Sequence, residues 1–127
     1  MSNPTSVLII EDVAELADSL EDMLTLAGYR ALKACTGREG YELAVTEHPD
    51  VILLDLRLPD IHGFELLRKL RADSWGATAR VLVLTASESP DLILSENLGL
   101  SIDDVLQKER WGIAELVQRV TSVLGQR

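Results

Sequence analysis

Residues 51–60 read VILLDLRLPD, an uninterrupted apolar run that ends at an acid, Asp55. Four consecutive apolar residues, rather than alternating ones, are typical of a strand that helices cover on both faces, as in a parallel sheet. Because burial of a lone carboxylate costs free energy, we expect Asp55 at the end of this strand, beside other polar groups. The segment therefore predicts both a buried sheet and a site at its edge.

The same strand pattern recurs along the chain. Val7–Ile10 and Val81–Thr85 are also apolar at consecutive positions, and Tyr29–Ala34 and Asp104–Gln107 are weaker strand candidates, expected nearer the edges. Helical patterns lie between the strands, so the order is strand then helix, repeated five times. Right-handed crossovers fold such a chain into an α/β domain, (βα)5, with a doubly wound parallel five-stranded sheet and helices on both faces.

Apolar stripes at helical spacing, or start and stop signals, mark five predicted helices. The first helix covers Ala17–Ala27, with Gly28 as its stop, and the second starts at a T-x-x-E capping box formed by Thr36 and Glu39. The third covers Phe64–Leu70, the fourth runs from Ser89–Pro90 to a stop at Gly99, and the fifth covers Ile113–Leu124. We find no linker, repeat or low-complexity tract. The sequence therefore predicts one domain over residues 5–125, with no further domain after it.

Charge and composition restrict the function. The 127 residues carry 21 acids against 12 Lys and Arg, a net charge of −9, which disfavours direct nucleic-acid binding because phosphate backbones are also negative. The single cysteine, Cys35, excludes an internal disulfide and fits a reducing compartment. No stretch approaches the roughly 20 apolar residues that cross a bilayer, and MSNPTS lacks the features of a secretory signal. We therefore expect a cytoplasmic location and no membrane contact.

Acidic residues follow two of the predicted strands. Glu11 and Asp12 come directly after Val7–Ile10, and Asp55 ends the strand that begins at Val51. Functional groups of open α/β sheets gather beyond the carboxyl ends of the strands, so adjacent strands would bring the three carboxylates together. Two such charges 4 Å apart repel by roughly 4 kcal/mol at an effective dielectric of about 20. A cluster of carboxylates and a carbonyl suits Mg²⁺.

Two further strand ends supply groups that a phosphoryl group would need. Thr85 offers a hydroxyl and Lys108 an ammonium, and an aspartate beside Mg²⁺ can attack phosphorus and carry an acyl phosphate. Each residue alone also has a structural interpretation. Asp12 with Glu15 forms a D-x-x-E pattern that could cap a helix. Asp55 could cap the turn at Pro59–Asp60, Thr85 could be an ordinary strand residue and Lys108 a surface lysine.

At these residues the sequence resembles the receiver domain of two-component response regulators, from about Val7 to Leu124. The matching pieces are IIED at 9–12, LLDLRLPDIHG at 53–63, LTAS at 84–87 and the lysine of LQKER at 106–110. Within the middle piece, Pro59 and Gly63 follow Asp55 at the family's spacing. The resemblance implies a flavodoxin-like strand order, 2-1-3-4-5.

The resemblance also implies a role for each site residue and a set of partners. Asp55 is expected to accept a phosphoryl group from a histidine kinase or phosphotransfer protein. The other implied roles are Mg²⁺ binding by Asp12, Asp55 and the backbone carbonyl of Arg57, support from Glu11 directly or through a water, and contact of Thr85 and Lys108 with the phosphoryl oxygens. Arg57 and Ser87 are expected at the pocket entrance. Phosphorylation would reshape the face of helix 4, strand 5 and helix 5 for a downstream protein target, an output domain or a second copy of the chain. The implied protein is a switch, not a metabolic enzyme.

Two departures from the family pattern keep alternatives open. Glu109 replaces the proline that often follows the lysine, so a trans bond is expected there, and Val105 replaces the usual aromatic switch residue. Both features favour a pseudo-receiver, an interaction module that signals without phosphate. A phosphohydrolase with an aspartyl nucleophile is a second alternative, although such enzymes have D-x-D where this chain has Asp55 and Arg57. The apolar segment 92–100 is either a buried helix or a partner surface.

Overall fold

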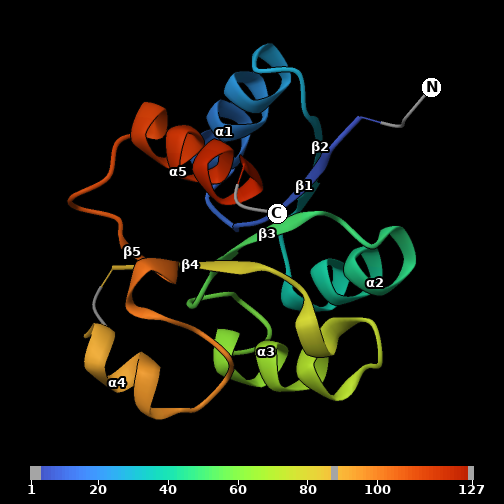
Figure 1. Ribbon diagram of the computed structural model, residues 1–127, viewed down its shortest axis with the longest axis vertical. Helices are drawn as coiled ribbons and strands as arrows, with labels where there is room; N and C mark the ends of the chain where they lie inside the picture. Colours follow the sequence, from blue (N-terminus) through green and yellow to red (C-terminus); the bar gives the residue numbers. More distant parts are fainter. Residues whose placement is uncertain (1–3, 87–88, 126–127) are drawn as a thin grey trace.

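The computed structural model describes residues 4–86 and 89–125. Its centre is a parallel five-stranded sheet in the order β2-β1-β3-β4-β5 (Figure 1). The strands are β1 (Ser6–Ile10), β2 (Arg30–Ala34), β3 (Val51–Asp55), β4 (Val81–Thr85) and β5 (Val105–Gln107). The helices are α1 (Ala14–Leu26), α2 (Gly37–Glu47), α3 (Gly63–Ala72), α4 (Pro90–Ser95) and α5 (Ile113–Gly125), with short 3-10 turns η1 (Gly76–Thr78) and η2 (Ile102–Asp104). The predicted fold class and strand order are confirmed.

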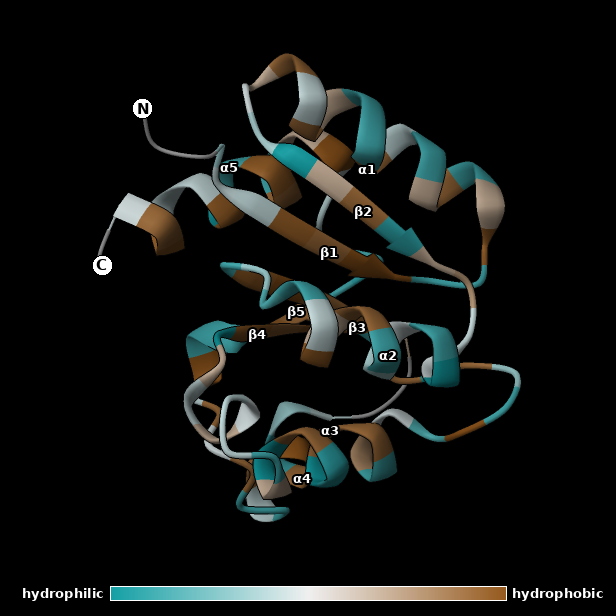
Figure 2. Cartoon of the chain, turned by 90° about the vertical axis from the view of Figure 1, so that its right-hand side faces the viewer, coloured by the Kyte–Doolittle hydropathy of each residue, from teal (hydrophilic) through white to brown (hydrophobic). Residues whose placement is uncertain are grey.

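Helices cover both faces of the sheet, as the consecutive apolar residues predicted. Figures 1 and 2 show α1 and α5 on one face and α2, α3 and α4 on the other. Successive residues of β1 point to opposite faces, so Val7 and Ile9 pack with α1 and α5 whereas Leu8 and Ile10 pack toward α2 and α3. Because both faces of β1, β3 and β4 are buried, most successive positions of these strands are apolar, which explains the absence of alternation. The edge strand β2 keeps Arg30 and Lys33 exposed.

Segment 92–100 buries two of its apolar residues, Ile93 and Leu98. Ile93, in α4, is completely buried, so the buried-helix interpretation is confirmed for this residue. Leu98 is 9% exposed but lies outside the helix, and Leu92 is 52% exposed. The predicted stop at Gly99 is wrong, because α4 ends at Ser95. Asn97 adopts a positive φ of 60°, a conformation that asparagine tolerates and that ends a helix.

One other predicted boundary and one predicted cap also differ. Asp104 is not a strand residue, because it ends η2 and its carboxylate accepts hydrogen bonds from Ser101. At the start of α2, Thr36 Oγ1 accepts from Glu39 N at 3.1 Å as predicted. Glu39 Oε1, however, accepts from Cys35 N at 2.9 Å rather than from Thr36, so only half of the capping box is as expected. None of the helices in the described residues is long and apolar enough to cross a membrane.

The cap at Thr36 yields a stability prediction. Thr36→Ala should lower the free energy of unfolding by about 1 kcal/mol, because the amide of Glu39 loses its acceptor at the helix start. Thr46→Ala is the matched control, since Thr46 is exposed in the same helix. Urea titrations of both variants measure the difference. Equal stabilities for the two variants would mean that the cap does not stabilise α2.

Candidate functional site

Strand register brings the acidic residues together at the carboxyl edge of the sheet. Ile10 of β1 pairs with Leu54 of β3, so Glu11 emerges beside Asp55, one residue beyond this pair. Glu11, Asp12 and Asp55 each offer a carboxylate oxygen, and these oxygens all lie within 4.8 Å of one another. Glu11 is 1% exposed and Asp55 4% exposed, whereas Asp12 faces solvent. The predicted convergence of the three acids is confirmed.

Lys108 reaches this cluster from the neighbouring end of β5. Its backbone N donates to the carbonyl of Thr85 at 2.8 Å, which extends the β4–β5 ladder by one residue. Its Nζ donates to Asp55 Oδ2 at 3.0 Å and lies 2.7 Å from Glu11 Oε1. Every peptide bond among the described residues is trans, as expected for the bond to Glu109. Lys108 therefore contacts both buried acids.

The buried carboxyl of Glu11 has a hydrogen-bond donor for only one of its two oxygens among the described residues. Its Oε2 accepts from Val13 N at 3.2 Å, but within the described part of the chain Oε1 receives no hydrogen bond of acceptable geometry, so the Lys108 contact is an ion pair only. Burial, then the hydrogen bond and charge of Asp55, raise the pKa of Glu11 to about 7, although Lys108 opposes the shift. The site can hold a proton at neutral pH.

The ammonium of Lys108 stays charged in this environment. Burial alone would lower its pKa, but the close contact with the Glu11 carboxyl, the hydrogen bond to Asp55 and the negative charges of both acids outweigh burial and raise the pKa above its ordinary value. One ammonium then faces two buried carboxyl groups and, nearby, Asp12. One ammonium does not neutralise three acids, so the site can accept a further cation.

Asp55 and Thr85 are positioned by the ends of β3 and β4. Asp55 is the register partner of Leu84, so Thr85 lies one residue further along the adjacent strand, and it is 1% exposed. The second oxygen of Asp55, Oδ1, accepts from the backbone N of Arg57 at 3.0 Å. The carboxylate is therefore oriented by Arg57 on one side and by Lys108 on the other.

The purely structural roles considered for Asp12 and Asp55, as caps of a helix and of a turn, do not explain where these two acids lie. The N-cap of α1 is Val13, with no side-chain cap in the described contacts, so the proposed capping role of Asp12 is wrong. Asp55 bonds Arg57 N rather than the turn at Pro59–Asp60. Val105, in place of an aromatic residue, is buried in the core at 8% exposure. Ser87, expected at the pocket entrance, lies outside the described residues.

Two residues near the site were missed by the sequence analysis. Asp60 accepts hydrogen bonds from the first amides of α2, those of Gly37 and Arg38, and His62 caps α3 through Nδ1, which accepts from Phe64 N at 3.1 Å. Histidine is a rare cap, and Asp60 acts on a helix that begins far upstream in the sequence. No local pattern indicated either contact.

The donor set fits Mg²⁺. Carboxylate oxygens are the hard ligands that this ion takes, and the buried Oε1 of Glu11 is an oxygen still without a hydrogen-bond donor among the described groups. Asp12, Asp55 and Glu11 could hold the ion directly or through its waters. The part assigned to the carbonyl of Arg57 stays a prediction.

The fold and this edge of acids, hydroxyl and ammonium define a doubly wound α/β domain with an acidic site at the carboxyl edge of its sheet. The family model of the response regulator receiver domain matches residues 7–121. The chain therefore belongs to the receiver domains of two-component response regulators.

Curated relatives and solved structures agree with this family. The DNA-binding dual master transcriptional regulator RpaA of Synechocystis is 38% identical over 119 residues, which cover 93% of this chain and 48% of that protein. The transcriptional regulatory protein CusR of Escherichia coli K12 is 37% identical over 118 residues, covering 93% of this chain and 50% of CusR. The chain thus spans about half the length of these relatives.

Among solved structures, the receiver domain of Francisella response regulator 1452 superposes with a TM-score of 0.83 at 29% identity, covering 98% of both chains. A CheY-like receiver domain protein from Methanospirillum hungatei JF-1 has a TM-score of 0.84 at 25% identity, covering 98% of this chain and 96% of that one. The likeness therefore extends over nearly the whole chain.

Proposed function

We propose that this domain is the phosphoacceptor of a two-component system, with Asp55 as the residue that is phosphorylated. The observation that carries the proposal is the cluster of Glu11, Asp12 and Asp55, whose oxygens lie within 4.8 Å of one another beside the Lys108 ammonium. A pure interaction module has no need of such a costly group of like charges. A site that binds Mg²⁺ and a phosphoryl group does.

The proposed reaction transfers a phosphoryl group from phosphohistidine to Asp55. A carboxylate oxygen of Asp55 forms the new bond to phosphorus, while the bond between phosphorus and the donor's ring nitrogen breaks and its electron pair stays on that nitrogen. Bound Mg²⁺ would supply charge neutralisation for the phosphoryl oxygens. Lys108, an ion pair partner of Asp55 at 3.0 Å, would turn to a phosphoryl oxygen, and the hydroxyl of Thr85 would donate to another.

The partners follow from this chemistry. The donor is a histidine kinase or a phosphotransfer protein, and the receiver of the signal is a downstream protein or an output domain. We propose that phosphorylation alters the face formed by α4, β5 and α5, where a target or a second copy of the chain would bind. The exposed Leu92 lies on α4, and the exposed Ile102 lies on η2, which directly precedes β5. The domain would act in the cytoplasm, as a switch rather than as an enzyme of metabolism.

Intact-mass spectrometry tests the proposal. In Mg²⁺ with a small acyl phosphate donor, the wild-type chain should gain the mass of one phosphoryl group, and EDTA should prevent the gain because the acid cluster is then left without its cation. Equal labelling in EDTA would contradict the role of the metal. No labelling with intact folding would favour the pseudo-receiver, and turnover of generic phosphate esters would favour the phosphohydrolase.

A further inference from the structure

The loop between β3 and α3, residues 56–62, has a closed base at the site. Arg57 and His62 form an antiparallel bridge, and Gly63 N donates to the carbonyl of Leu56 at 2.8 Å. Leu56 N in turn donates to the carbonyl of Leu84 at 3.2 Å. The base therefore holds the two ends of the loop together, and the position of its tip depends on what the tip contacts.

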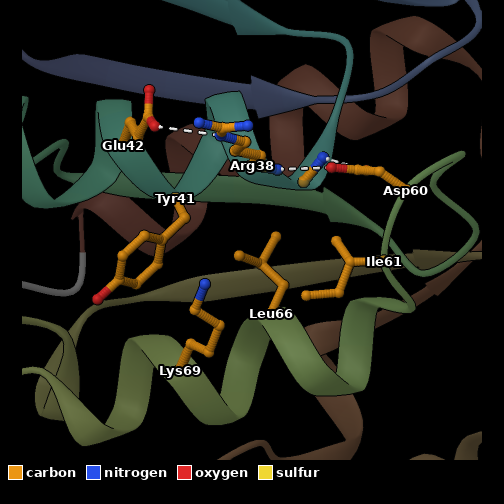
Figure 3. A pocket seen from close by; sticks show the side chains of 8 residues that line it. Arg38, Tyr41, Glu42, Asp60, Ile61, Leu66 and Lys69 are labelled. Atoms are coloured by element: carbon orange, nitrogen blue, oxygen red, sulfur yellow. Dashed lines mark hydrogen bonds and ion pairs between the residues drawn. The ribbon is translucent and has the colours of Figure 1, made fainter.

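Asp60, at this tip, binds the start of α2. Its Oδ1 accepts from Gly37 N at 2.8 Å and its Oδ2 from Arg38 N at 3.0 Å. Figure 3 shows Asp60 extending from the loop toward the first turn of the helix. These two backbone hydrogen bonds lower the pKa of Asp60, so the carboxylate remains charged at neutral pH, as the positive end of a helix favours.

Close packing at Gly37 reinforces this contact. A Cβ atom at Gly37 would lie 2.0 Å from Cγ2 of Ile61 and 3.4 Å from Cδ1 of Leu58. The loop thus lies directly on the backbone of α2, where no larger residue fits without movement. Ile61 and Asp60 also line one end of a cavity of about 440 Å³ between α2 and α3, so open space adjoins the contact and leaves the loop room to shift.

The start of α2, which donates hydrogen bonds to Asp60, also lies close in the chain to the other side of the acid cluster. Glu11 N donates to the carbonyl of Ala34 at 3.0 Å, and α2 begins only three residues after Ala34. We call the two hydrogen bonds from Gly37 N and Arg38 N to Asp60 the clasp. The clasp joins two chain segments that flank the cluster, the end of β2 beside Glu11 and the loop that carries Arg57. Both must keep their positions if the ligand oxygens are to stay within reach of one ion.

We propose that Asp60 is a positioning residue of the metal site: by clasping the first amides of α2 it holds the loop that carries Arg57, and so sets the affinity of the unphosphorylated domain for Mg²⁺. This inference rests on the proposed function. It assigns to Asp60 a role in ligand placement beyond that of a helix cap, since a cap alone would change stability without changing metal affinity.

Calorimetric titration with Mg²⁺ tests this role on the whole chain. Asp60→Ala should weaken binding about tenfold, the lower end of the effect of outer-shell partners on metal affinity. Asp60→Asn should lie between this variant and the wild type, because its amide oxygen can still accept from one backbone N–H. Thr36→Ala is the matched control: it removes another cap from the same helix start but leaves the loop contact intact, so its Mg²⁺ affinity should equal that of the wild type.

Three results would overturn the inference. Wild-type affinity in Asp60→Ala would show that the clasp does not place the ligands, and an equal loss in Thr36→Ala would assign the effect to the helix as a whole. If the wild type itself binds no Mg²⁺, both this role and the proposed function fail, so the two failures are distinguishable. Thermal unfolding of each variant is recorded in parallel, and Asp60→Asn carries the test if Asp60→Ala does not fold.

Discussion

Replacement of Asp55 by asparagine should abolish phosphorylation of the domain. The amide oxygen carries no negative charge and is a poor nucleophile, and the variant also loses one of the three carboxylates that would hold Mg²⁺. Asparagine is nearly the same size, so its oxygen can still accept from Arg57 N, which lies 3.0 Å from the carboxylate in the wild type. We therefore expect a folded protein that gains no phosphoryl mass with Mg²⁺ and an acyl phosphate.

Asp22→Asn is the control for this variant. Asp22 is an exposed acid of α1, so its replacement makes the same change of charge away from the site and should leave labelling at the wild-type level. Peptide mapping of the labelled wild type should place the group on Asp55. Phosphorylation that persists in Asp55→Asn would assign the acceptor to another residue and refute the proposed mechanism.

Raising the pH from 5.5 to 8.0 without Mg²⁺ should lower the free energy of unfolding by about 2 kcal/mol through Glu11 alone. Burial and Asp55 raise the pKa of Glu11 in the folded chain to about 7, from an ordinary value of 4.5. Between these two values the folded state holds a proton that the unfolded state has released. The contribution of Glu11 to the free energy of unfolding is therefore present at low pH and is lost as the pH rises through about 7. The raised pKa of Lys108 has no effect in this range, because the ammonium is charged in both states.

Urea titrations in EDTA at the two pH values measure this effect, with Glu11→Gln as the reference. The glutamine cannot titrate, so the change in stability between the two pH values should be about 2 kcal/mol smaller in the variant. Addition of Mg²⁺ to the wild type should restore stability at pH 8.0, because the ion compensates the ionised acids and binds only the folded state. An identical pH dependence in both proteins would mean that Glu11 is ionised throughout.

These two predictions share one physical cause. The domain gathers Glu11, Asp12 and Asp55 at one edge of its sheet although like charges repel, and Lys108 offsets only part of the repulsion. The folded chain therefore loses stability when these acids are all ionised and no cation is bound. The same arrangement makes a divalent ion, and then a phosphoryl group held by that ion, favourable additions to the site.

Much of the fold was predictable because apolar patterning is local. The runs at 7–10, 51–55 and 81–85 could be buried only as strands covered on both faces, and the acids at the ends of the first two could only lie at one edge of such a sheet. The end of α4 was not predictable from Gly99, since Asn97 turned the chain earlier. Signals that compete within a few residues leave helix ends undecided until the surrounding contacts are formed.

The sequence by itself determined the alternation of strands and helices, the buried positions and the residue types available to the site. Only the tertiary structure decided which groups meet: β1 lies beside β3 in a register that places Glu11 by Asp55, Lys108 reaches both acids from β5, and Asp60 binds the start of α2. The reason is physical. Burial of an apolar residue depends on its own strand or helix, whereas a hydrogen bond or ion pair needs two distant segments within about 3 Å, and only their packing supplies that.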